Sequence, residues 1–165
     1  GGHGKLVRCM PNTPALIGAG ISGLYALPEV SAEERNRAET ILGAVGEVVW
    51  LADEKLLDPV TAVSASGPAY VFWFIEQLAA SAERLGIPKG DALKLALHTV
   101  LGAAKLAVSA KESPAELRKQ VTSRGGTTEA ALKVFDEEKL AERFARAIEA
   151  ASRRGGELGE EFGKH

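Results

Sequence analysis

The pattern of apolar residues changes at Asp53, and this change limits the folds open to the chain. Residues 54–153 contain repeated stretches of helical periodicity, separated by Gly or Pro, and no stretch that alternates as a strand does. Residues 5–52 hold short apolar runs that end at Pro or Gly. The sequence therefore predicts a mainly α chain with two domains, 1–52 with strands and 53–165 all-helical.

The first part reads as β-β-α-β on a small scale. Strand-like runs occupy residues 5–9, 20–27 and 47–52, and we expect the last one to be buried. Ser31 and Glu34 have the S-x-x-E spacing of a capping box, which predicts a helix ending near Leu42. Three short strands and one helix are too few for a core of their own, so we expect more sheet beside them.

The second part reads as six helices followed by a frayed tail. The predicted helices span residues 54–64, 68–85, 91–110, 115–121, 128–137 and 140–153. In the third, the side chains expected to point inward are Leu93, Leu97, Leu101 and Leu106. The second, "AYVFWFIEQLAASAERL", is apolar nearly all round in its first half, which is typical of a helix buried on several sides. So small a bundle cannot cover it, so we expect a partner subunit.

The overall composition excludes several classes of partner. With 20 basic and 22 acidic residues, the net charge of −2 gives no electrostatic case for nucleic acid or an anionic membrane. The longest mostly apolar stretch, residues 69–80, is too short to span a bilayer, and no signal peptide is evident. A single cysteine and three scattered histidines predict no metal site and fit a reducing, cytoplasmic location.

A G-x-G-x-x-G pattern, the spacing of a dinucleotide fingerprint, is formed by Gly18, Gly20 and Gly23. Its context does not fit. Pro11 and Pro14 leave too little room for a strand before the pattern, and Pro28 blocks a helix after it. We interpret these glycines as serving turns and close backbone approach in a loop and edge strand. A flavin-binding fragment is the less favoured alternative.

The loop "VTSRGGTTEAAL", residues 121–132, is a better candidate for chemistry. Gly125 and Gly126 let the backbone turn its N–H groups toward one point, and Thr127 and Thr128 start the next helix. The free N–H groups of a helix start favour an anion. The pattern predicts a site for a small carboxylate or phosphate, although an ordinary interhelix turn fits the spacing equally well.

A second candidate loop is "MPNTP", residues 10–14. Two prolines hold Asn12 in a rigid loop at the end of a strand, where α/β sheets bind ligands. On spacing alone, a plain crossing loop is somewhat favoured.

Several segments together resemble pyrroline-5-carboxylate reductase, in order from about Lys5 to Arg154. They are "VRCMPNTP", "LLDPVTAVSASGPAYVF", "TVLGAAKL" and "SPAELRKQVTSRGGTTEAALKVFDEEKL". Two residues depart from the family pattern: Ala65 stands in place of a Gly, and Arg124 in place of a Pro. The second departure puts a flexible cation beside the predicted anion site.

The resemblance implies reduction of 1-pyrroline-5-carboxylate to L-proline with NADP or NAD as cofactor, the last step of proline biosynthesis. It implies a Rossmann-type domain followed by a helical dimerisation domain. Because the chain opens without Met and lacks the fingerprint, we expect it to be the C-terminal part. That part would hold the last strands of the first domain and all of the second. The cofactor would bind mainly to the missing domain. The partner would be a second copy, in a homodimer or a higher oligomer.

The resemblance also implies roles for individual residues. Thr128 is the hydroxyl near the ring nitrogen and Val121 is a wall of the ring pocket. The carboxylate cradle is Ser123 with the N–H groups of Gly125, Gly126 and Thr127. Glu54 and Gln120 lie near the substrate or cofactor, and Asn12 lies under the nicotinamide. An alternative from another class is that the isolated chain is a helical dimerisation module without activity.

Overall fold

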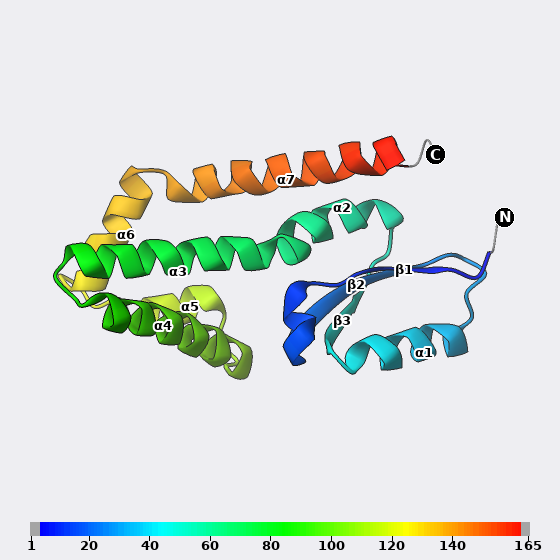
Figure 1. Cartoon of the computed structure of the whole chain (residues 1–165), viewed down its shortest axis with the longest axis horizontal. Coiled ribbons are helices and arrows are strands. Elements are labelled where there is room, and N and C mark those ends of the chain that lie inside the picture. The colour runs from blue at the N-terminus through cyan, green and yellow to red at the C-terminus, as the bar shows by residue number, and fades with distance from the viewer. Residues whose placement is uncertain (1–3, 163–165) are drawn as a thin grey trace. The chain divides into compact units, whose positions relative to one another are not determined.

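The computed structural model describes residues 4–162 (Figure 1). The chain forms two compact units: one comprises the residues up to Tyr70 together with those from Arg146 on, and the other is Val71–Ala145. The last strand ends at Trp50, two residues before the predicted end, and the next helical turn begins at Glu54 as expected. The assignment of domains to residues 1–52 and 53–165 stays a prediction.

The first unit contains a three-stranded sheet in the order β1-β2-β3. Strand β1 (Val7–Met10) runs antiparallel to β2 (Gly20–Ala26), and β2 runs parallel to β3 (Gly46–Trp50). Helix α1 (Ala32–Gly43) connects the parallel pair and packs against β3. Strand β2 carries the core of the sheet, since Ser22, Leu24 and Ala26 are all buried.

Two details of this sheet differ from expectation. Strand β2, which holds two of the three glycines and was expected at an edge, is the middle strand of the described sheet. Strand β3, expected to be buried, alternates between half-buried and exposed residues, and Val49 is 48% exposed. The apolar run was read as a fully buried strand, but β3 pairs with β2 alone among residues 4–162.

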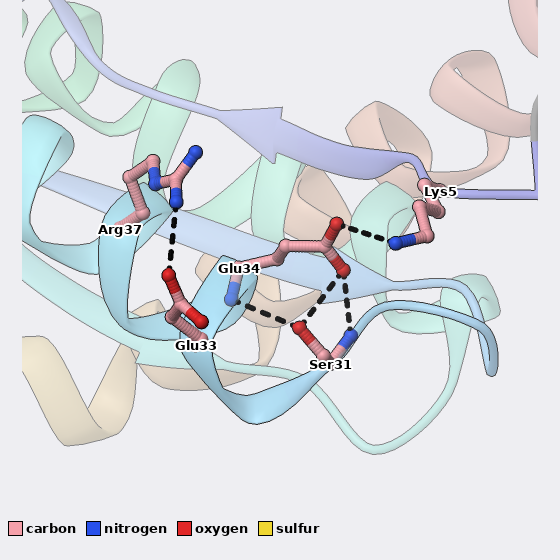
Figure 2. Close-up of polar contacts among 5 residues, drawn as sticks. All are labelled: Lys5, Ser31, Glu33, Glu34 and Arg37. Carbon is pink, nitrogen blue, oxygen red and sulfur yellow. Dashed lines mark hydrogen bonds and ion pairs between the residues drawn. The ribbon is translucent and has the colours of Figure 1, made fainter.

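Helix α1 begins at the predicted capping box (Figure 2). The Ser31 hydroxyl accepts a hydrogen bond from the Glu34 N–H at 3.3 Å, and the Glu34 carboxylate accepts one from the Ser31 N–H at 2.9 Å. Lys5 adds an ion pair to the same carboxylate at 2.8 Å. These contacts, the Lys5 bond foremost, lower the pKa of Glu34 to about 2.

The three glycines of the fingerprint-like pattern serve backbone geometry. Gly18 has φ +69° and caps the short 3-10 helix η1 (Thr13–Ile17). Gly23 lies so close to Val60 that an added Cβ would stand 2.7 Å from its Cγ1. No helix follows Gly23, because β2 continues to Ala26. The pattern therefore lacks the strand-to-helix turn that holds a pyrophosphate.

The sequence predicts one helix over residues 54–64, but the structure has three short turns of different helical type there. They are the 3-10 turn η2 (Glu54–Leu56), the α-helical turn α2 (Leu57–Val60) and the π-helical turn η3 (Thr61–Ala65). Leu57 and Ala62 are buried, and α2 packs against β2. This packing, which local periodicity does not report, sets the wider turn.

The second unit is entirely helical. It contains most of α3 (Gly67–Arg84), then α4 (Lys89–Ser109), α5 (Pro114–Gln120), α6 (Thr127–Glu137) and the start of α7 (Leu140–Phe162). Figure 1 shows α3 and α4 as a hairpin with a short turn. Helix α5 begins at the predicted capping box, in which Ser113 and Glu116 bond reciprocally. The same bonds lower the pKa of Glu116.

Large apolar side chains of this unit are exposed, contrary to one expectation. The residues of α4 that were expected inward, Leu93, Leu97, Leu101 and Leu106, are about half exposed. The residues of α4 that are buried are Ala92 and Ala96. On α3, Phe72 and Trp73 are each 59% exposed. A single copy of the chain does not cover these faces, which agrees with the expectation of a partner subunit.

Helix α4 also bears on the membrane question. Its length and composition would allow it to cross a bilayer, whereas the longest mostly apolar stretch named in the sequence analysis, residues 69–80, is too short to do so. One such helix is weak evidence, because an apolar interface helix passes the same test.

The tail from residue 154 was expected to fray, but α7 continues to Phe162. Arg154 forms ion pairs with Glu157 and Glu161, both at 2.9 Å, and these raise the pKa of Arg154, with Glu161 the larger cause. Gly155 lies against Asp58, since an added Cβ would stand 3.8 Å from the Asp58 Cβ. These contacts extend the helix past glycines that would end it in isolation. Residues 163–165 lie outside the described range.

Candidate substrate-binding loop

The loop between α5 and α6 is held in a tight turn by its own backbone. The Gly126 N–H donates to the Ser123 carbonyl at 3.0 Å, and Gly125 has φ +72°, which only glycine adopts readily. The Ser123 hydroxyl lies directly over Gly126, where an added Cβ would stand 2.5 Å from Oγ. The backbone at residue 125 therefore favours glycine, whereas a side chain at residue 126 would have to displace the Ser123 hydroxyl.

The turn leads directly into the exposed N-terminus of helix α6. Gly126 is the N-cap of α6 and has no side chain to bond the first turn. Within residues 4–162, the backbone N–H groups of Thr127 and Thr128 donate to no protein acceptor. Two free N–H groups at the positive end of a helix dipole suit an anion such as a carboxylate.

Two of the predicted donors are already engaged. The Gly125 N–H donates to the Glu129 carboxylate at 2.7 Å, and the Gly126 N–H is used inside the turn. Of the cradle predicted from Gly125, Gly126 and Thr127, the structure thus leaves Thr127 free. The N–H group of Thr128 joins it.

Side chains around the turn offer further contacts. Within residues 4–162, the hydroxyls of Ser123, Thr127 and Thr128 make no hydrogen bond to the chain, whereas Thr122 donates to the Arg118 carbonyl at 2.6 Å. Val121 ends α5 and is 65% exposed beside the turn. An apolar wall, several hydroxyls and two N–H groups therefore belong to one stretch of chain.

Of the remaining predicted site residues, Gln120 is the exposed last residue of α5, whereas Asn12 and Glu54 lie in the first unit. The Asn12 amide accepts from the Ile21 N–H at 2.9 Å and donates to the Ser64 carbonyl at 3.4 Å. Glu54 forms an ion pair with Arg8 at 2.6 Å. The Asn12 side chain holds its loop to β2 and to η3, so it acts first as a support for that loop.

Two residues near these sites were missed at the sequence level. Glu129 lies at the third position of α6, where a capping-box glutamate is common, and this spacing was a usable signal. Ser64 lies on the π-helical turn, and its Oγ is buried without a hydrogen-bond partner in the described chain. No local sequence pattern predicts a π-helical turn.

The fold and the loop define a helical domain with an exposed, glycine-containing interhelix turn, attached to part of an α/β sheet. The family model described as "Pyrroline-5-carboxylate reductase dimerisation" matches residues 54–158. The chain belongs to this family.

Relatives and solved structures agree with this assignment. Over 96% of its length the chain is 49% identical to pyrroline-5-carboxylate reductase of Pseudomonas aeruginosa, and over 93% it is 45% identical to that of Synechocystis. It covers 58% and 57% of these relatives, respectively.

The pyrroline-5-carboxylate reductase structure from Coxiella burnetii is 45% identical, with a TM-score of 0.91 over 93% of this chain and 57% of that one. The NADP-bound pyrroline carboxylate reductase structure from Plasmodium falciparum is 28% identical, with a TM-score of 0.86 over 94% of this chain and 62% of that one. The chain thus spans somewhat more than half the length of the proteins it resembles.

Proposed function

We propose that the protein carrying this chain reduces 1-pyrroline-5-carboxylate to L-proline with NADP or NAD as cofactor, in the cytoplasm. In this proposal the chain is the C-terminal part, which contributes the substrate loop and the subunit interface. The observation that carries the proposal is the free helix start at Thr127 and Thr128, in a chain 49% identical to a pyrroline-5-carboxylate reductase over nearly its whole length.

The loop would hold the substrate by its carboxylate. The N–H groups of Thr127 and Thr128 supply two donors, and the Ser123 hydroxyl lies over the same turn. A carboxylate there gains both hydrogen bonds and the dipole of α6. Gly125 and Gly126 contribute by making the turn, so they bind the substrate indirectly.

The ring of the substrate would lie between Val121 and Thr128. The Val121 side chain offers an apolar surface, and the Thr128 hydroxyl can bond the ring nitrogen, which carries a proton in the product. When bound, NAD(P)H supplies the hydride that reduces the C=N bond. The imine is basic enough to take its proton from solvent, so the loop's contribution is orientation of the ring.

In this proposal the first unit contacts the nicotinamide end of the cofactor. Its glycine pattern lacks the turn that would hold a pyrophosphate, whereas the loop at Asn12 is rigid and lies at the end of β1. We assign Asn12 to support of the nicotinamide side. Glu54 and Gln120 are proposed near the substrate or cofactor.

The partner would be a second copy of the chain. Support comes from the exposed apolar residues of α3 and α4 and from the family's description as a dimerisation domain. About 25 cal/mol is gained for each Å² of apolar surface removed from water, so covering several such side chains stabilises a dimer.

Thr128→Ala in the full gene product tests the role of the loop. We expect the KM for pyrroline-5-carboxylate to rise or kcat to fall, with about a tenfold loss in kcat/KM, measured as NADPH oxidation at saturating cofactor. Thr128→Ser keeps the hydroxyl and should retain most of the activity. Unchanged constants in Thr128→Ala would remove Thr128 from the site.

A non-catalytic dimerisation module remains the second candidate for the chain by itself, because its exposed apolar faces serve assembly without any cofactor. The 165-residue chain, mixed with NADPH and pyrroline-5-carboxylate, should show no turnover. Turnover at the rate of the full gene product would contradict the module assignment.

A further inference from the structure

A buried hydroxyl on the first unit lacks a partner. Within residues 4–162, the Oγ of Ser64 is a side-chain oxygen that is covered and makes no hydrogen bond, although the residue as a whole is half-buried. Leaving a buried hydroxyl unpaired costs free energy, and such groups in native proteins call for an explanation. The hydroxyl belongs to the π-helical turn η3, and such turns are frequent at functional sites.

The surroundings of Ser64 are rigid. Its carbonyl accepts the Asn12 amide at 3.4 Å, and the same Asn12 side chain accepts the Ile21 N–H. One turn earlier, Val60 lies against Gly23 of β2. The turn is thereby fixed to the sheet at two points, while the Ser64 side chain keeps its rotation about one bond.

The Asn12 amide and the Ser64 hydroxyl differ in how much hydrogen-bonding capacity they have left for a ligand. The Asn12 amide uses one N–H and one oxygen lone pair on the protein. The Ser64 hydroxyl makes no hydrogen bond to the described chain, and the residue as a whole is half-buried. Beside the Asn12 loop, Ser64 therefore carries a hydroxyl whose full hydrogen-bonding capacity is unused.

We propose that the Ser64 hydroxyl binds the carboxamide of the nicotinamide ring, and that Asn12 is a positioning residue that holds Ser64 in place. This rests on the proposed function. A hydroxyl donates one hydrogen bond and accepts others, and a carboxamide offers both an oxygen and an NH₂ group. Binding supplies the partner that the hydroxyl lacks, so the ligand relieves a cost that the free protein carries.

The experiment compares Ser64→Ala with the wild type in the full gene product. NADPH binding is titrated by fluorescence, binding of adenosine 2′,5′-bisphosphate by calorimetry, and thermal unfolding is followed without ligand. We expect about fivefold weaker NADPH binding, unchanged bisphosphate binding and an unchanged or raised Tm. The bisphosphate lacks the nicotinamide, so it isolates the contact.

Thr61→Val is the matched control on the same turn. The Thr61 hydroxyl donates to the Leu57 carbonyl at 2.7 Å, so its loss should lower Tm slightly and leave NADPH binding unchanged. Equal NADPH binding by Ser64→Ala and wild type would overturn the inference. So would a lowered Tm with unchanged binding, which would mean that the hydroxyl is satisfied by an ordered water. A wild type that binds no NADPH would overturn the proposed function as well.

Discussion

The carboxylate of Glu129 accepts a hydrogen bond from the backbone N–H of Gly125 at 2.7 Å. The chain thus places a carboxylate of its own on the loop where we propose that the substrate carboxylate binds. Two carboxylates held by neighbouring donors of one loop repel each other. Glu129 stabilises the turn when the substrate is absent and opposes the substrate when it arrives.

Replacing this carboxylate should therefore favour binding. Glu129→Gln keeps the length of the side chain, removes the charge and weakens the bond to Gly125. In the full gene product we expect the KM for pyrroline-5-carboxylate to fall by about fivefold with kcat unchanged, measured by steady-state kinetics.

The control is Glu137→Gln at the other end of α6. That carboxylate pairs with Lys133 at 3.8 Å, so the variant changes the net charge equally but away from the loop. Its KM should stay at the wild-type value. A higher KM in Glu129→Gln would show that Glu129 prepares the loop for the substrate instead of competing with it.

The exposed aromatic face of α3 should hold two copies of the chain together. Trp73 is 59% exposed in one copy, and a charge placed at its position would be buried in the dimer without a partner. We expect the wild-type chain to have twice the monomer mass in light scattering. Trp73→Glu should dissociate at least about a hundredfold more readily.

Asn36→Asp adds the same charge at an exposed position of α1 and should leave the dimer intact. If Trp73→Glu and wild type show the same dimer mass at all dilutions, another face makes the interface.

The contact between Gly23 and Val60 should be intolerant of one extra methyl group. Because a Cβ at residue 23 would stand 2.7 Å from Val60 Cγ1, Gly23→Ala should cost about 1–3 kcal/mol of unfolding free energy, measured by urea denaturation. Val60→Ala makes room for the methyl. The double variant should then lose less stability than the sum of the two single variants, whereas strict additivity would mean that the backbone of β2 moves to relieve the clash.

Acid should remove the contribution of Glu34 to stability. Its pKa is about 2 in the folded chain, against 4.5 for an unperturbed group, first because of Lys5 and then because of Ser31. Because the pKa of Glu34 is lower in the folded chain than in the unfolded chain, the ionised carboxylate stabilises the folded state above pH 4.5. This stabilisation is lost as the pH falls toward 2.

The comparison for this prediction is Glu34→Gln. The stability advantage of wild type over Glu34→Gln should shrink between pH 5 and pH 2 in chemical denaturation. Lys5→Met should remove the largest part of the advantage. A constant difference across that range would contradict the assignment.

Structural features that depend on contacts among a few consecutive residues were predictable from the sequence. The boxes at Ser31 and Ser113 start helices as expected, because the bonds that make a box join residues three apart. The turn between α5 and α6 was predictable for the same reason, since Gly125 and Gly126 shape it through their own backbones. Glu129 has the spacing of a capping box from Gly126, but Gly126 has no side chain to complete the box, and the Glu129 carboxylate bonds the Gly125 N–H instead.

Features that depend on distant contacts were not predictable. The π turn at residues 61–65 forms where α2 packs on β2, and nothing in its own sequence departs from an α-helix. Helix α7 continues past Gly155, where Asp58, nearly a hundred residues away, lies within ordinary contact distance and Arg154 forms ion pairs. The exposed leucines of α4 were read as inward because periodicity identifies an apolar face without identifying what covers it.

The three-stranded sheet has a consequence for how the chain behaves in a test tube. Among the described residues, the outer backbone groups of β3 pair with no other strand, and Val49 adds an apolar side chain to that side. Such a row of donors and acceptors templates the addition of any extended segment, including another copy of β3. The isolated chain should therefore polymerise slowly as its concentration rises. Other measurements on the isolated chain therefore require dilute samples that are stored only briefly.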